Sequence, residues 1–298
     1  MTKFLLDSGD PNEYREISKI AKYGGSEIWG ATTNPSLIAK KLAGQKITPE
    51  KAYELQKEIV MEIIEIVPGA VSAEVYADTN TTAEAMTEQG IEIAKWHPRV
   101  VVKIPTTLEG FKARTALRKE KVITNNTLVF SQEQIFAICL HEKICRKSFD
   151  LIDPPTDGWP PFISPFVGRL DDIGQNGMDL IGNGMRIKEL FTDKNLAWML
   201  EASVRKQNHI KEGIDTKIEL ITAPAASYRE WFAKQEFKEK IKNELKPIDF
   251  WQPPQKLIEI DTIDEFMSAI VSGKLNINHD LTDKGIARFV DDWKAILV

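Results

Sequence analysis

The chain has 298 residues and a mass of 33.7 kDa, a size that suits one large domain or two ordinary ones. Hydrophobic residues make up 42% of it and charged residues 28%, which provides a sizeable core and excludes a disordered protein or a coiled coil. The net charge is -5 with both signs mixed, so binding to nucleic acid or to a membrane surface is not expected, and an anionic ligand needs a local group of basic residues.

Short apolar, β-branched runs alternate with longer helical patterns, which is typical of repeated βα units. Eight such units predict a closed (β/α)8 or TIM barrel of the α/β class, forming one domain over residues 1–298. In chain order, the predicted strands are Phe4–Leu6, Ile28–Ala31, Ala70–Tyr76, Val100–Ile104, Val122–Leu128, Phe162–Pro165, Trp198–Ala202 and Ile218–Thr222.

Capping residues and first-turn prolines mark the clearest helix starts. Asp10-Pro11 with Glu13 opens one helix, and Thr48-Pro49 opens another that runs to about Val67. Asn34-Pro35 by itself indicates only a turn. Further helices are expected at Thr82–Trp96, Leu108–Lys119, Ser131–Arg146 and Arg205–Glu212.

Two irregular segments interrupt this pattern. Residues 147–161 are rich in proline and are expected to form a loop beside the barrel. Around Pro247 to Pro254 a second such segment separates the barrel from a C-terminal helical tail, residues 247–298, which we expect to pack on the barrel.

Polar residues recur where the apolar runs end, although a polar side chain is costly in a strand that is buried on both faces. In a (β/α)8 barrel the carboxyl ends of all strands meet at one face, where the active site is built. The sequence therefore predicts a site at that face containing Asp7, Asn34, Glu74, Lys103, Asn125, Thr127, Ser164 and Ser203.

Lys103, at the end of Val100-Val101-Val102, carries the most specific chemistry. Burial disfavours an ammonium ion and leaves a neutral amine that can attack a carbonyl group. In the alternative, the stem of Lys103 packs on the barrel while its ammonium reaches solvent. Asp7 and Glu74 could supply the acid and base that imine chemistry requires, or could form a structural salt bridge with Lys103.

Arg169 and Arg205 follow the sixth and seventh strands, where an arginine fork can bind a phosphate, although a surface role is the alternative for each. The four histidines show no zinc spacing, and no glycine-rich phosphate loop or dinucleotide motif is present. We therefore expect neither a metal nor a cofactor. Cys139 and Cys145 lack redox spacing, and Met1–Leu6 is too short for a signal peptide, so a cytoplasmic protein is expected.

Several motifs, in order along the chain, resemble those of the transaldolase family, the Schiff-base sugar-phosphate enzymes of the pentose phosphate pathway. The last of them is similar to the final helix of that family. The motifs are Thr32-Thr33-Asn34-Pro35-Ser36-Leu37, Val102-Lys103-Ile104-Pro105 with Glu109-Gly110, Asn125-Asn126-Thr127-Leu128-Val129-Phe130-Ser131, Ile163-Ser164-Pro165-Phe166-Val167-Gly168-Arg169, Ala202-Ser203-Val204-Arg205, and Gly285-Ile286-Ala287-Arg288-Phe289 with Asp291.

The resemblance implies a role for each predicted site residue. Lys103 would form the Schiff base, and Asp7 would take the proton of the C4 hydroxyl during carbon–carbon cleavage. Glu74 would assist imine formation and hydrolysis through a water held by Thr127. The implied substrate contacts are Asn34, Asn125 and Ser164 to hydroxyl groups, Phe166 in the pocket, and Arg169, Ser203 and Arg205 to the phosphate.

The resemblance further implies transfer of a dihydroxyacetone unit from sedoheptulose 7-phosphate or fructose 6-phosphate to glyceraldehyde 3-phosphate or erythrose 4-phosphate. Glu74 and Phe166 favour transfer, because the related fructose-6-phosphate aldolase branch typically has Gln and Tyr near these positions. Two alternatives remain: an aldolase-type lyase, and a barrel that binds sugar phosphates without catalysis. A homo-oligomer is a family-level expectation.

Overall fold

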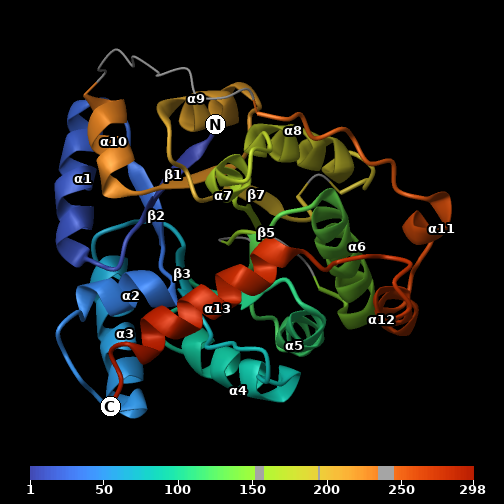
Figure 1. Ribbon diagram of the computed structural model, residues 1–298, viewed down its shortest axis with the longest axis horizontal. Helices are drawn as coiled ribbons and strands as arrows, with labels where there is room; N and C mark the ends of the chain where they lie inside the picture. Colours follow the sequence, from blue (N-terminus) through green and yellow to red (C-terminus); the bar gives the residue numbers. More distant parts are fainter. Residues whose placement is uncertain (152–157, 194, 234–244) are drawn as a thin grey trace.

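Eight parallel strands close into a barrel in the order of the sequence, with β1 pairing both β2 and β8 (Figure 1). The computed structural model describes residues 1–151, 158–193, 195–233 and 245–298. The predicted (β/α)8 barrel is therefore confirmed. The strands are β1 Lys3–Asp7, β2 Ile28–Thr32, β3 Val71–Glu74, β4 Val100–Pro105, β5 Thr124–Val129, β6 Phe162–Pro165, β7 Trp198–Glu201 and β8 Leu220–Ala223.

Helices follow the strands and form the outer layer (Figure 1). At the starts of α1, α2 and α3 a proline occupies the first turn, and the side chain of Asp10, Asn34 or Thr48 accepts a hydrogen bond from a backbone N–H. The barrel helices are α1 Pro11–Tyr23, α2 Pro35–Lys41, α3 Pro49–Ile64, α4 Ala83–Ala94, α5 Leu108–Lys119, α6 Gln132–Phe149, α7 Val167–Asp172, α8 Gly177–Lys188, α9 Gln207–Asp215 and α10 Ala225–Phe232.

Local patterns missed some of these helices. The turn expected at Asn34-Pro35 is wrong, because Asn34 caps α2 by accepting the Leu37 N–H at 2.9 Å. Helices α7, α8 and α10 were not predicted; α7 is only six residues long, and α8 contains three glycines, which weaken a helical pattern. The loop expected at 147–161 starts later, since α6 continues to Phe149, and residues 152–157 lie outside the described part.

The C-terminal tail follows an irregular segment at 247–254, as predicted, and contains α11 Gln255–Ile258, α12 Ile263–Val271 and α13 Asp280–Lys294. Figure 1 shows α13 crossing in front of the barrel, from beside β5 toward α2. The Thr282 hydroxyl donates to the Leu128 carbonyl at 2.9 Å, directly at the end of β5. The last residue is also attached to the barrel region, because the Val298 N–H donates to the Ile47 carbonyl at 3.0 Å. The tail thus lies over the carboxyl ends of the strands.

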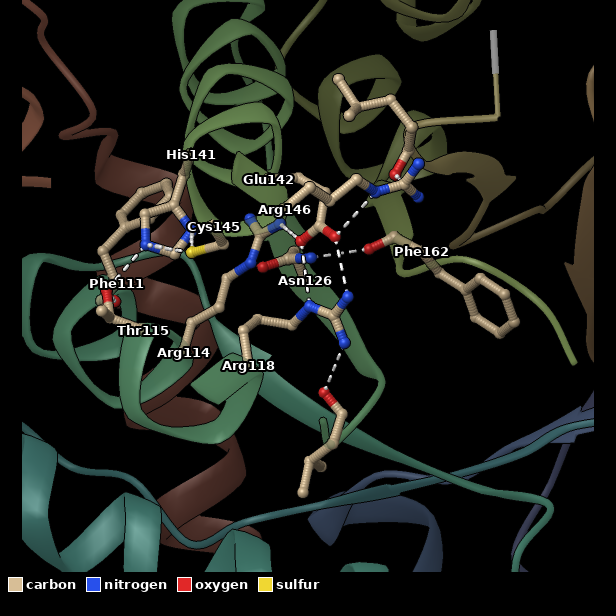
Figure 2. Close-up of polar contacts among 12 residues, drawn as sticks. Phe111, Arg114, Thr115, Arg118, Asn126, His141, Glu142, Cys145, Arg146 and Phe162 are labelled. Atoms are coloured by element: carbon tan, nitrogen blue, oxygen red, sulfur yellow. Dashed lines mark hydrogen bonds and ion pairs between the residues drawn. The ribbon is translucent and has the colours of Figure 1, made fainter. Parts of the chain in front are cut away.

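Between α5 and α6 lies a group of charged residues, here named the outer cluster: the buried Arg114, Arg118 and Glu142, and the partly exposed Arg146 (Figure 2). The Glu142 carboxylate accepts from Arg118 at 2.9 and 3.1 Å and from Arg114 at 3.0 Å. Arg146 reaches the same carboxylate at 3.3 Å and donates to the Leu196 carbonyl, just before β7. The outer cluster therefore links α5 and α6 to the segment just before β7, and none of its residues lines the cavity described below.

Candidate active site

Strand register brings three of the predicted site residues side by side. Glu74 on β3 pairs with Lys103 on β4, and Lys103 pairs with Asn125 on β5. On the adjacent strands β1 and β2, Asp7 pairs with Thr32, and β2 in turn pairs with β3. Asp7, Thr32 and Glu74 are the last residues of their strands, at the end of the barrel that we call the barrel mouth. Strand register places Lys103 and Asn125 level with Glu74.

Lys103 is enclosed at the mouth and only 3% exposed. Its Nζ donates to the Thr33 carbonyl at 2.9 Å and lies 3.1 Å from Glu74 Oε2 in an ion pair. The alternative with a solvent-exposed ammonium is therefore wrong. The expected salt bridge with Glu74 is present, and it places an acid directly against the amine.

Asp7 and Glu74 are both carboxyl groups in a poorly solvated environment. Burial raises the pKa of Asp7, while the nearby Lys103 charge and a hydrogen bond from Thr32 oppose that rise. That Thr32 hydroxyl donates to Asp7 Oδ1 at 2.7 Å and contacts the Thr222 hydroxyl at 2.7 Å. Burial likewise raises the pKa of Glu74, against the charge of Lys103. Both groups are consequently suited to proton transfer at a pH above the ordinary carboxyl range.

Hydroxyl and amide groups complete the mouth. Ser164 on β6 donates to Asn125 Oδ1 at 2.6 Å, and Asn125 donates to the Ser72 hydroxyl at 3.1 Å. Thr127 Oγ1 is buried without a hydrogen-bond partner among the described residues, and Glu74 Oε2 likewise has only its ion pair with Lys103. Buried polar atoms of this kind are costly unless a further donor or acceptor reaches them.

An open cavity of about 170 Å³ occupies the mouth. Eight of the predicted residues line it: Asp7, Asn34, Lys103, Ser164, Phe166, Arg169, Ser203 and Arg205. Asn125 and Thr127 are not part of its lining, and Glu74 lines a much smaller neighbouring cavity of about 10 Å³. The sequence assigned no role to the other lining residues: Thr32, Ser36, Leu37, Leu200, Ala202, Thr222, Arg288 and Phe289. Arg288 and Phe289 belong to the last motif of the resemblance, so the signal for them was present.

Arginine side chains gather at one side of this cavity. The Arg169 guanidinium lies 5.2 Å from the Phe166 ring centre and 5.5 Å from that of Phe289. Its pKa is lowered to about 10 by burial and then by the charges of Arg288 and Arg205. Arg205 itself forms a two-pronged ion pair with Asp172, at 2.9 and 3.1 Å. Three positive charges thus lie close together at the opening.

Backbone geometry fixes the approach of α7 to the end of β7. Ser203 has a left-handed backbone with φ of 59°, which is uncommon for a residue other than glycine. The Gly168 N–H donates to the Ser203 carbonyl at 3.1 Å. A Cβ at position 168 would lie only 2.2 Å from that carbonyl oxygen, so Gly168 permits the contact.

Within the described residues no group of three or more His, Cys, Asp or Glu side chains is arranged to hold a metal ion. Among the described helices, none combines the length and the apolar character needed to cross a membrane.

A (β/α)8 barrel that encloses a lysine, two carboxyl groups and several arginines at the carboxyl ends of its strands has the layout of a barrel enzyme. The family profile described as Transaldolase/Fructose-6-phosphate aldolase matches residues 4–298. The chain belongs to the transaldolase/fructose-6-phosphate aldolase family, and it is an enzyme.

Two of three curated relatives match nearly the whole chain. A "Probable transaldolase" of Caldicellulosiruptor saccharolyticus is 33% identical over 294 residues, 99% of this chain and 98% of that protein. One from Methanococcus maripaludis is 31% identical over 98% of both chains. A third, from Lachnoclostridium phytofermentans, is 37% identical over 74% of this chain and 86% of its own length.

Proposed function

We propose that this enzyme is a transaldolase that forms a Schiff base between Lys103 and the ketone of a sugar phosphate. The observation that carries the proposal is the position of the Lys103 amine. It is buried at the mouth, lines the cavity, and lies 3.1 Å from the Glu74 carboxyl group. That contact gives the ammonium proton a nearby acceptor, because burial has raised the pKa of Glu74.

Imine formation would begin with transfer of that proton to Glu74. The neutral amine attacks C2 of the ketose, a C–N bond forms, and the carbonyl oxygen leaves as water after protonation. The unpartnered atoms Glu74 Oε2 and Thr127 Oγ1 can both hydrogen bond with such a water. These two residues, on β3 and β5, flank the strand that carries Lys103.

Carbon–carbon cleavage would use Asp7 of β1, which also lines the cavity. Its carboxylate takes the proton of the C4 hydroxyl, the C3–C4 bond breaks, and its electron pair moves into the protonated imine. An aldose phosphate leaves, and a three-carbon enamine stays on Lys103 until a second aldose phosphate accepts it. Asn34, Asn125 and Ser164 would bind hydroxyl groups, while Arg169, Ser203 and Arg205 would bind the phosphate.

Transfer rather than hydrolysis of the enamine is favoured by Glu74 and Phe166. Phe166 is 7% exposed and presents an apolar ring at the cavity. A pocket tyrosine, by contrast, would add a hydroxyl group that could take part in proton transfer. The donors would be sedoheptulose 7-phosphate or fructose 6-phosphate, and the acceptors glyceraldehyde 3-phosphate or erythrose 4-phosphate, within the pentose phosphate pathway.

As proposed, the enzyme is one barrel domain over residues 1–298, with the tail at 247–298 packed on it. It works in the cytoplasm, without a cofactor, and it forms a homo-oligomer as its family suggests. The free, buried thiols of Cys139 and Cys145 agree with a reducing compartment.

Borohydride reduction in the presence of fructose 6-phosphate tests the proposal. We expect a covalent sugar adduct on Lys103, located by peptide mass spectrometry. Lys188→Met is a matched control, since Lys188 is also buried and pairs with Glu219 at 2.5 Å, but on α8 outside the cavity. The Lys188→Met variant should form the sugar adduct normally, whereas Lys103→Met should form none. An adduct on another lysine would contradict the assignment, and turnover without an aldose-phosphate acceptor would instead identify a lyase.

A further inference from the structure

The tail helix α13 contributes side chains to the active-site cavity. Arg288 and Phe289, both on α13, line it together with Arg169 from α7. Arg288 is close enough to Arg169 for its charge to lower the pKa of Arg169. Two like charges at short range repel each other, and an anion that binds between them removes that repulsion.

Arg169 is held by ring contacts rather than by a carboxylate. Its guanidinium lies 5.2 Å from the Phe166 ring centre and 5.5 Å from the Phe289 ring centre, and it makes no hydrogen bond or ion pair with a described residue. Stacking on aromatic faces orients a guanidinium while leaving its N–H donors free. Arg169 is therefore oriented and still able to bind an anion through its fork.

Gly285 makes the approach of α13 possible. A Cβ at position 285 would lie 2.7 Å from Arg169 Nη1 and 2.6 Å from Leu128 Cδ2. Either distance is too short for a real contact, so Arg169 or α13 would have to shift. The absence of a side chain at position 285 thus allows the Arg169 guanidinium to pack directly against α13.

Arg205 and Arg288 differ in how their charges are compensated. Both prongs of the Arg205 fork contact Asp172, so a phosphate must compete with that carboxylate for its donors. Arg288 has a weaker attachment, with Nε 3.7 Å from Asp292 Oδ2, and its side chain is 66% exposed. Its donors remain available at the rim of the cavity.

We propose that Arg288 of the tail helix binds the phosphate group of the sugar together with Arg169, and that Phe289 and Gly285 position Arg169 for this contact. The inference rests on the proposed function for the identity of the ligand. It makes α13 part of the substrate site, with a residue to which the resemblance assigned no role.

Arg288→Gln is the direct test, with KM and kcat measured for fructose 6-phosphate. Loss of one charge-assisted contact should raise KM about 10-fold and leave kcat within about 2-fold. The inhibition constant of inorganic phosphate, used as a competitive inhibitor, should rise by a similar factor. The control is Lys284→Gln, which removes the same charge from an exposed position on α13 outside the cavity lining. Equal KM values in the two variants would overturn the proposal.

Borohydride trapping with dihydroxyacetone, which carries no phosphate, separates this inference from the proposed function. Arg288→Gln should label as well as the unmodified enzyme, because the amine and its acid are untouched. If the unmodified enzyme does not label at all, the Schiff-base function fails, while weaker phosphate binding by Arg288→Gln in calorimetry still supports the anion contact. Reduced labelling of Arg288→Gln with dihydroxyacetone would show damage to the whole mouth and contradict a phosphate-specific role.

Phe289→Leu and Gly285→Ala test the positioning of Arg169. Each should raise KM for fructose 6-phosphate several-fold, because Arg169 loses a ring contact or is displaced. Trapping with dihydroxyacetone should again be unchanged. Unaltered KM in both variants would exclude a positioning role for these residues.

Discussion

The barrel mouth and the outer cluster both bury charged side chains, but they satisfy them differently. In the outer cluster the Glu142 carboxylate receives three arginines in a closed interface between helices. At the mouth Lys103 contacts a single carboxylate beside an open cavity, and Glu74 Oε2 and Thr127 Oγ1 have no hydrogen-bond partner among the described residues.

The kinds of ion also differ, and this decides what each region can do. Arginine stays charged in proteins, so the outer cluster cannot relieve its burial cost by moving a proton. A buried lysine and carboxyl group can do so, since the proton can pass from one to the other. The outer cluster is therefore suited to holding helices together, and the mouth to chemistry.

Lys103→Met should have the largest effect on activity. Removal of the proposed nucleophile should lower kcat/KM about 10⁴-fold or more. Stability should change little, because Glu74 can take up a proton once its partner is gone, as its raised pKa already favours. Steady-state assays and urea unfolding of the same sample measure both quantities. Retained turnover would refute the Schiff-base role.

Glu142→Gln should show the reverse behaviour. It removes the charge of a buried carboxylate that Arg114 and Arg118 share, so the free energy of unfolding should fall by about 3–5 kcal/mol. Urea unfolding measures the loss, and activity at low temperature should persist in the folded fraction. The control is Glu133→Gln, in the first turn of the same helix, which should cost less than about 1 kcal/mol. A loss as small as that of the control would remove the contrast between the two regions.

Arg169→Gln should shift the acid side of the pH profile. The positive charge of Arg169 lowers the pKa of both Asp7 and Glu74, against the larger effect of burial. Without that charge both carboxyl groups protonate at higher pH. Because the proposed base must be ionised, kcat/KM should then decline at a higher pH than in the unmodified enzyme. Profiles that differ only in height would contradict this coupling.

Glu201→Gln tests a further buried carboxyl group, which lacks both the ion pair of the mouth and the arginines of the outer cluster. Burial, and then the charge of Glu212, raise the pKa of Glu201 well above its ordinary value. A raised pKa contributes stability at low pH that is lost as the pH rises through it. The variant should therefore be more stable by roughly 1 kcal/mol at pH 8 and equal near pH 4.

Urea midpoints at the two pH values measure this difference. Glu189→Gln, at an exposed position, should show no such pH dependence. A destabilised Glu201→Gln at pH 8 would mean that the carboxylate has a stabilising role that its surroundings do not reveal.

Local sequence patterns were sufficient to predict the barrel and many of the polar residues that line the cavity. Buried parallel strands have continuous apolar runs, so their ends were visible, and polar residues at those ends are confined to one face by barrel closure. This is why Asp7, Lys103 and Ser164 were predicted together and all line the cavity. The short helix α7 and the glycine-containing α8 were missed because tertiary packing, not local pattern, maintains them.

The sequence by itself determined which chemical groups stand at the barrel mouth, because strand periodicity and barrel closure place them there. Only the tertiary structure decided which of these groups are paired. It set the 3.1 Å contact of Lys103 with Glu74 and the pairing of Arg205 with Asp172. It also brought Arg288 and Phe289 of α13 against Arg169, more than a hundred residues earlier in the chain. Such contacts depend on how the tail crosses the mouth, which no local pattern specifies.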